Sequence, residues 1–198
     1  MTVPRLLLST TNRGKLRELR EILAPLAISV IAPADIGYDP QVEEDGLTFE
    51  ANAIKKAEAG LAATGEWTIA DDSGIEARAL GWRPGVYSAR YAGEPSDDAA
   101  NNRKLVDELA NHTDRYVQYR CVIALSRPGA ATQCWSGIFA GEHIPTPRGQ
   151  GGFGYDPYVL IPSLGQTVAE LSPEHKHRLS HRGQALRACL EWLENHRA

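Results

Sequence analysis

The chain has 198 residues, of which 42% are hydrophobic, and its 25 acidic residues against 21 lysines and arginines give a formal net charge of −4. This is enough for a globular protein with a real core, and the acidic balance argues against a general nucleic-acid binder, which would carry a basic excess. No apolar run approaches the roughly 18 residues needed to span a bilayer, and no secretory leader is visible, so we expect a cytoplasmic protein without a membrane partner.

The N-terminal segment is predicted to open an α/β unit. Residues 5–9, RLLLS, read as a buried strand, residues 14–26 as a helix with leucines on one face, and AISVIAP as a second short strand. Between the first strand and the helix lies the polar loop TTNRGK, from Thr10 to Lys15. A helix start offers unpaired N–H groups and the positive end of the macrodipole, so this loop is either an anion-binding site or a plain turn that Asn12 caps.

An acidic stretch precedes the next predicted helix. Glu43, Glu44 and Asp45 come just before Thr48, which is a plausible N-cap for a helix reaching about residue 63. These acids could simply compensate the helix dipole. However, Thr48, Asn52 and Lys56 follow at four-residue intervals and share one helix face, which suits a site for magnesium and phosphate.

Two aspartates follow the predicted strand EWTIA. We expect that strand to end at Asp71 and Asp72, whose side chains should point to opposite faces because side chains alternate along a strand. Only one of them can then serve a given site. Carboxylates at this place could hold magnesium against a phosphate, whereas the alternative is an Asx-type turn at a strand end.

The second half of the chain predicts a helix, two long strands and a final helix. Asp97 or Ser96 should cap a helix over DDAANNRKLVDELAN; residues 115–125 alternate with period two, and SRPGAA turns the chain into the strand TQCWSGIFAGEHI. The last helix should begin near Ser180. We therefore expect one mixed α/β domain over residues 1–198, formed as two lobes.

Two C-terminal motifs could contact a nucleotide. In GQGGFGYDP, Phe153 or Tyr155 could stack on a base and Asp156 could accept hydrogen bonds from it, although such glycine-rich turns are also common in cores. In SPEHKHRLSHRGQAL, His181 and Arg182 fall in the first turn of a helix, where cations are disfavoured unless an anion arrives. A zinc site at His177 and His181 would lack a third ligand and a continuous helix.

Six motifs in chain order give the sequence a resemblance to the inosine triphosphate pyrophosphatase family. They are TTNRGK, GLTFEANAIKKA, ADDSG, PGVYSARYAG, GGFGYDP and SHRGQAL, and they extend from about residue 10 to residue 190. The resemblance implies an elongated α/β fold with two lobes around a central cleft, a homodimer, and magnesium-dependent hydrolysis of non-standard purine nucleoside triphosphates to the monophosphate and pyrophosphate.

The resemblance also implies roles for residues. Glu44 and Asp72 would hold Mg²⁺, and Asp72 would be the general base for the attacking water. The substrate-binding set would be Thr10, Thr11, Asn12, Arg13, Gly14, Lys15, Lys56, Ser73, Phe153, Gly154, Tyr155, Asp156, Lys176, His181 and Arg182. Two alternatives remain open, namely a non-catalytic nucleotide-binding regulator and a pyrophosphatase for modified pyrimidine nucleotides.

Overall fold

A single mixed sheet runs through the chain. The computed structural model describes residues 5–24 and 28–195, and within them seven strands are hydrogen-bonded in the order β2-β1-β3-β4-β5-β6-β7. The strand β1 pairs in parallel with β2 and β3, whereas β6 pairs antiparallel with β5 and β7. The predicted α/β class is therefore confirmed. The strands are β1 (Leu6–Leu8), β2 (Val30–Ile31), β3 (Trp67–Ala77), β4 (Tyr116–Ser126), β5 (Gln133–His143), β6 (Val159–Ile161) and β7 (Gln166–Thr167).

The α-helices of the described residues are α1 (Arg13–Leu23), α2 (Phe49–Thr64), α3 (Asp98–Leu109), α4 (Pro173–Leu179) and α5 (His181–Asn195). Side-chain caps set where four of them begin, as oxygens of Asn12, Thr48, Asp97 and Ser172 accept bonds from backbone N–H groups of the first turn. The capping roles predicted for Thr48 and Asp97 are confirmed. Within the described part of the chain, the helices include none with the length and apolar character to cross a membrane.

Three sequence predictions need correction. The strand expected to end at the two aspartates continues to Ala77 as β3, so Asp71 and Asp72 lie in its middle. The helix α1 begins one residue before the prediction and ends at Leu23, while residues 25 and 26 of the predicted helix lie outside the described residues. The short helix α4 was not predicted, and it ends at Leu179, just before α5 begins.

The chain divides into two compact units. Unit 1 consists of residues 1–72, 121–137 and 182–198, and unit 2 consists of residues 73–120 and 138–181. The cleft that the family resemblance implies stays a prediction.

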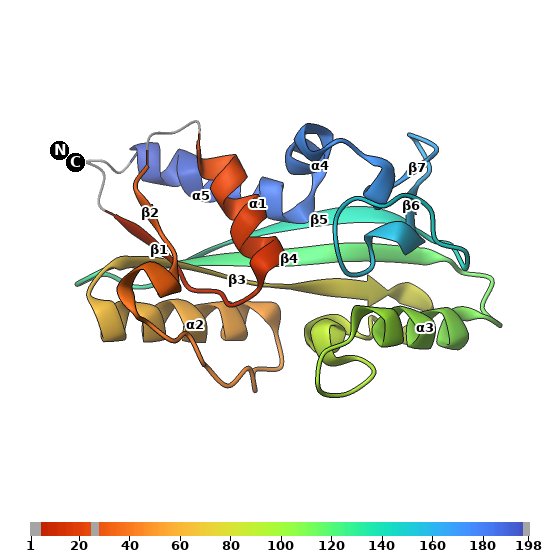
Figure 1. The fold of residues 1–198 in the computed structure, drawn as a ribbon, viewed down its shortest axis with the longest axis horizontal. Helices are drawn as coiled ribbons and strands as arrows, with labels where there is room; N and C mark the ends of the chain where they lie inside the picture. Colours follow the sequence, from red (N-terminus) through yellow and green to blue (C-terminus); the bar gives the residue numbers. More distant parts are fainter. Residues whose placement is uncertain (1–4, 25–27, 196–198) are drawn as a thin grey trace. The chain divides into compact units, whose positions relative to one another are not determined.

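In unit 1, α1 and α5 cover one face of the strands and α2 covers the other (Figure 1). The first face is sealed by a core of aliphatic side chains and cysteines, among them Leu8, Leu19, Ile69, Cys121 and Leu186. On the opposite face Gly60 of α2 lies against Thr68 of β3, where an added Cβ would come within 2.6 Å of the threonine Cγ2. The absence of a side chain at Gly60 thus sets how closely α2 approaches β3.

In unit 2, the core draws on α3, the strands and the segment that contains β6, β7 and α4. Its buried members are Ile75, Ala77, Tyr91, Leu105, Leu109, Val117, Tyr119, Phe139, Tyr155, Val159, Ile161, Val168 and Leu171. Figure 1 shows α3 on one side of the strands of this unit and α4 on the other.

Candidate active site

The loop between β1 and α1 leads from a strand directly into the first turn of a helix, which Asn12 caps. Asn12 Oδ1 accepts from Lys15 N at 3.0 Å, and the Thr10 hydroxyl accepts from Asn12 N at 3.2 Å. The first turn of α1 contains no acidic residue, so the positive end of the helix dipole is not compensated locally. Thr11, Asn12 and Arg13 are exposed. The loop is a strand-to-helix junction as predicted.

Asp71 and Asp72 contact different partners, as expected for neighbours on one strand. Asp71 Oδ2 lies 3.1 Å from Lys15 Nζ and 3.3 Å from Arg182 Nη2. Asp72 Oδ1 lies 3.3 Å from Lys56 Nζ, and its Oδ2 accepts from Asn52 Nδ2 at 3.1 Å. The prediction that the two carboxylates point to opposite faces is confirmed.

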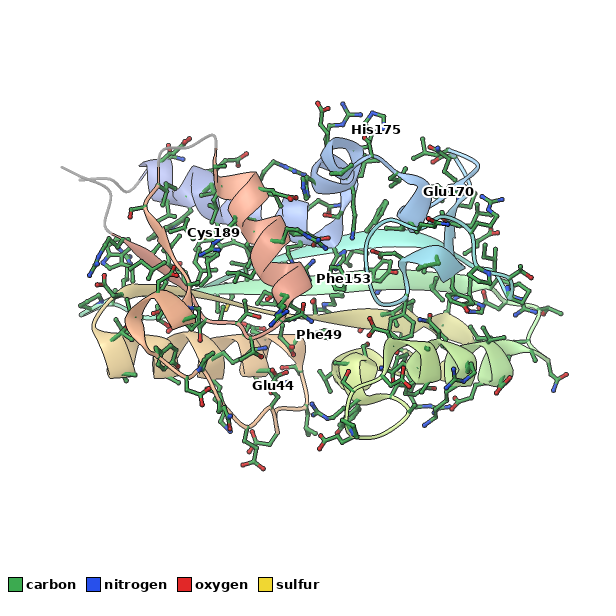
Figure 2. All side chains as sticks on the ribbon, in the orientation of Figure 1. Glu44, Phe49, Phe153, Glu170, His175 and Cys189 are labelled. Carbon is green, nitrogen blue, oxygen red and sulfur yellow. The ribbon has the colours of Figure 1, made fainter. Side chains whose placement is uncertain are left out.

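Lys56 joins the acidic segment before α2 to the aspartate on β3. Its Nζ is 3.1 Å from Glu44 Oε1 as well as 3.3 Å from Asp72 Oδ1, and the side chain is buried. Asn52, one turn earlier on α2, accepts from Gly46 N at 2.8 Å. Figure 2 shows the labelled Glu44 on the loop that leads into α2. Asn52 and Lys56 of the predicted polar face are therefore buried with Asp72, and Glu44 reaches the same lysine from a half-buried position.

The charged groups of this cluster shift one another's pKa. Burial raises the pKa of Asp72, Lys56 and Lys15 oppose that rise, and Glu44 reinforces it. Burial alone would lower the pKa of Lys56, but Asp72, Glu44 and Asp71 outweigh it and raise the pKa. Burial would likewise raise the pKa of Asp71, yet Lys15, Arg182 and Lys56 hold that pKa well below its usual range. Asp71 is thus a permanent carboxylate, whereas Asp72 is disposed to accept a proton.

A second buried network in unit 1 includes a residue that the sequence reasoning missed. Arg182 is 2% exposed; it donates from Nη1 to Glu18 and from Nε and Nη2 to Asp71. Glu18 lies three residues after Lys15 on α1, so the two share a helix face. Arg182, predicted to bind substrate, is placed by the structure as an ion-pair partner of these acids. In the sequence, Glu18 stands directly before Leu19, which belongs to the apolar face of this helix. That position was the available indication that Glu18 is buried.

In unit 2, Asp156 organises the glycine-rich loop. Its Oδ2 accepts from Phe153 N at 2.9 Å and from Lys176 Nζ at 2.7 Å, and its Oδ1 accepts from the Tyr119 hydroxyl at 3.0 Å. Lys176 Nζ also lies 4.8 Å from the ring centroid of Phe153, which is labelled in Figure 2. Gly152 has φ +71°, and an added Cβ would lie 2.0 Å from Asp156 Oδ2, so only glycine fits there.

The helix α3 fixes the next part of this loop. Gly154 N donates to Asp98 Oδ2 at 3.1 Å, and Gly154 O accepts from Asn102 Nδ2 at 3.0 Å. The Tyr155 hydroxyl donates to the backbone oxygen of Ser88 at 2.7 Å, which anchors the buried ring. Sequence reasoning missed Asp98 and Asn102, since nothing local to α3 indicates a contact with a loop some fifty residues later.

The remaining predicted residues of unit 2 are Ser73 and His181. Ser73 follows the aspartates on β3 and is partly buried. His181 is buried, and its ring stacks on Tyr119 with centroids 4.9 Å apart and an interplanar angle of 11°. The break between α4 and α5 separates His181 from His177, so the two histidines do not share one continuous helix, as expected from the sequence.

The residues present fit a magnesium ion in kind and number. Among the described residues, no group of three or more His, Cys, Asp and Glu side chains is arranged to hold a metal by itself. Glu44 and Asp72 do, however, place one oxygen each within 3.3 Å of the same ammonium nitrogen. Magnesium is typically bound through one or two carboxylates, with substrate phosphates and waters completing the octahedron, so two are sufficient.

A mixed α/β fold that buries paired carboxylates among lysines defines a protein that can bind a polyanion beside acid–base groups, the class that includes phosphate-ester hydrolases. The chain matches the model of the Ham1 family over residues 6–192 and belongs to that family.

Named relatives are similar over nearly the whole length. The chain is 47% identical over 191 residues to a dITP/XTP pyrophosphatase of Desulforamulus reducens, covering 96% of this chain and 95% of the relative. It is 45% identical over 190 residues to a dITP/XTP pyrophosphatase of Bacillus subtilis, covering 95% and 96%. A solved Ham1 protein from Coxiella burnetii superposes with a TM-score of 0.88 at 40% identity, covering 98% of this chain and 100% of that one. The resemblance drawn from the sequence motifs is confirmed.

Proposed function

We propose that this protein hydrolyses non-standard purine nucleoside triphosphates, dITP, ITP and XTP, to the nucleoside monophosphate and pyrophosphate. The observation that carries the proposal is the cluster in which the buried Lys56 contacts both Glu44 and Asp72. The names of the relatives, dITP/XTP pyrophosphatase, support the same activity.

In unit 1 we assign the phosphate chemistry. The loop from Thr10 to Lys15 binds the triphosphate through backbone N–H groups and the lysine charge. Asp72 orients the attacking water and takes its proton, a role that suits a carboxylate whose pKa is raised by burial. Glu44 and Asp72 would hold Mg²⁺, which supplies charge neutralisation at the phosphate oxygens when bound. Lys56 stays cationic and limits the repulsion between these acids and the substrate.

In unit 2 we assign recognition of the base. Phe153 offers a ring for stacking, Asp156 and Lys176 offer hydrogen-bonding groups, and the nearby backbone of Gly154 and Tyr155 allows close approach. A 6-keto oxygen can accept a hydrogen bond from His181 where an amino group cannot. Arg182 could donate to the same oxygen, but its Nε, Nη1 and Nη2 already donate to acids of unit 1, so we give His181 the larger part.

A substrate panel tests the proposal. Purified protein with Mg²⁺ is given the triphosphates of inosine, xanthosine, adenosine, guanosine and thymidine, and pyrophosphate and monophosphate are both quantified. We expect equimolar products, with inosine and xanthosine substrates strongly preferred. Binding without product would indicate a regulator, preference for a modified pyrimidine would indicate the related specificity, and equal turnover of inosine and adenosine triphosphates would refute base selection at position 6.

Two further features belong to this proposal. We propose a homodimer, which sedimentation of the purified protein would test. We also propose a cytoplasmic site of action, which suits an enzyme of nucleotide metabolism; Cys121, Cys134 and Cys189 are all free thiols.

A further inference from the structure

Tyr119 of β4 lies between two of the groups assigned to base recognition. Its hydroxyl donates to Asp156 Oδ1 at 3.0 Å, and its ring stacks on His181 at a centroid distance of 4.9 Å. All three side chains are buried, with Tyr119 6% exposed. No motif of the sequence singled out this tyrosine, which falls within the predicted strand over residues 115–125.

We propose that Tyr119 is a positioning residue that sets base selectivity by fixing Asp156 and His181 relative to each other. This inference rests on the proposed function. A strand is a rigid support, and one side chain on it reaches the glycine-rich loop through a hydrogen bond and the start of α5 through a ring stack. Displacement of either group by a fraction of an ångström would therefore disturb hydrogen bonds that are sensitive to distance and angle.

The hydrogen bonds of Asp156 show why one hydroxyl matters. Oδ2 already accepts from Phe153 N and Lys176 Nζ, and the Tyr119 hydroxyl is a donor to the other oxygen. Without that donor the carboxylate can rotate about its χ2 bond, and the bond that orders Phe153 weakens with it. Tyr119 thus controls the loop through Asp156.

The stack with His181 constrains a second degree of freedom. An interplanar angle of 11° leaves the imidazole little freedom to rotate while the tyrosine ring is in place. Tyr119→Phe removes only the hydroxyl and retains this stack, whereas Tyr119→Leu removes both. The two variants therefore separate the effect on Asp156 from the effect on His181.

The test compares these variants with Tyr116→Phe, a matched control. Tyr116 lies three residues earlier on β4, and its hydroxyl contacts the Gln118 side chain at 3.1 Å rather than a site residue. For Tyr119→Phe we expect kcat/KM for dITP to fall about ten-fold, mainly through KM, in line with the loss of one hydrogen bond to a charged group. We expect a larger fall and a reduced preference for inosine over adenosine triphosphate in Tyr119→Leu, and no change in Tyr116→Phe.

Coupling to Asp156 identifies a positioning role. If Tyr119 acts through that carboxylate, adding Tyr119→Phe to Asp156→Asn should lower kcat/KM much less than Tyr119→Phe does alone. The inference would be overturned if the loss of kcat/KM in the double variant equalled the product of the losses in the two single variants. It would also be overturned by a Tyr119→Phe protein with unchanged KM and selectivity.

A substrate-free measurement keeps this inference separate from the proposed function. Amide hydrogen exchange over residues 149–156 should accelerate in Tyr119→Phe and not in Tyr116→Phe, because the bond from Phe153 N to Asp156 loses its support. Unchanged exchange would overturn the inference even in an active enzyme. Failure of the wild-type protein to cleave dITP would instead refute the proposed function, and the exchange result would still decide whether Tyr119 orders the loop.

Discussion

At the scale of single residues, Asp72 and Asp71 show how one strand gives two adjacent carboxylates different chemistry. Asp71 faces Lys15 and Arg182, which keep it ionised, whereas Asp72 shares Lys56 with Glu44 and accepts from Asn52. The cationic partners of Asp71 lower its pKa, and burial near a second acid raises that of Asp72. The difference gives the first a fixed charge and supports the proton-transfer role that we propose for the second.

Asp72→Asn should lower kcat by roughly 10²- to 10⁴-fold while the substrate still binds, the range expected when a general base is lost. Asparagine has the same shape, so the change removes the charge and the proton acceptor with little effect on packing. Single-turnover rates and calorimetric titration with inosine triphosphate would measure the two quantities separately. Asp45→Asn is the control, because Asp45 pairs with Lys55 on the surface of the same segment. Turnover close to wild type would rule out the role assigned to Asp72.

At the scale of elements, the glycine-rich loop depends on one position where no side chain fits. Gly152→Ala places a Cβ 2.0 Å from Asp156 Oδ2 at φ +71°, so the loop must move. We expect kcat/KM for dITP to fall by at least ten-fold. Gly165→Ala is the control, since it has a similar φ of +64° with no atom within 4 Å and carries only the backbone strain of about 1 kcal/mol. Comparable losses in the two variants would show that strain, rather than contact with Asp156, is responsible.

At the contact of α2 with β3, we expect Gly60→Ala to lower stability, although helix propensity alone favours alanine. Alanine is favoured over glycine in a helix by about 1 kcal/mol, yet Gly60→Ala brings a Cβ within 2.6 Å of Thr68 Cγ2. Overpacking of a buried contact typically costs about 1 to 3 kcal/mol, so we expect a net loss of stability by chemical denaturation.

Thr68→Ser removes the clashing methyl group and can keep the hydroxyl's bond to Glu66 O. It should therefore destabilise the Gly60→Ala protein less than it destabilises the wild type. A Gly60→Ala protein more stable than wild type would mean that α2 can shift away from the strand at little cost.

Local sequence chemistry predicted where α2 and α3 begin. Thr48 and Asp97 mark helix starts because a cap is decided by residues within one turn. The extent of β3 was wrong, because the segment DDSG suits a turn unless distant groups compensate its charges. Lys15, Lys56 and Arg182 provide that compensation in the fold.

In the candidate site, too, local sequence features could be predicted and contacts between distant residues could not. Motifs pointed to Glu44, Lys56 and Asp156, whose residue types and neighbours are unusual in themselves. They did not point to Glu18 or Tyr119, which contribute only through contacts that the tertiary fold creates. The roles assigned to all of these residues stay predictions that the variants above test.

At the scale of the whole molecule, stability should depend on pH through His143 at the end of β5. The side chain is 2% exposed, and within the described residues neither ring nitrogen has a hydrogen-bond partner. Burial, aided by the charge of Arg115, lowers its pKa from 6.5 to about 4. The unfolded chain therefore binds a proton here between those pH values while the folded chain does not, so stability falls as the pH drops from 6.5 towards 4.

The expected size of this effect is about 2 kcal/mol between pH 7 and pH 5, which follows from the two pKa values by linkage. His143→Phe can retain the ring stacked on Tyr158 but cannot bind a proton. Urea denaturation of the wild type and the variant at pH 7 and pH 5 would isolate the contribution of His143. Carboxylates that titrate in the same range affect the two proteins equally and cancel in the comparison. The variant should lose less stability on acidification than the wild type by that amount. Equal losses of stability in the two proteins would mean that His143 has a proton-accepting partner, or water, in the folded protein.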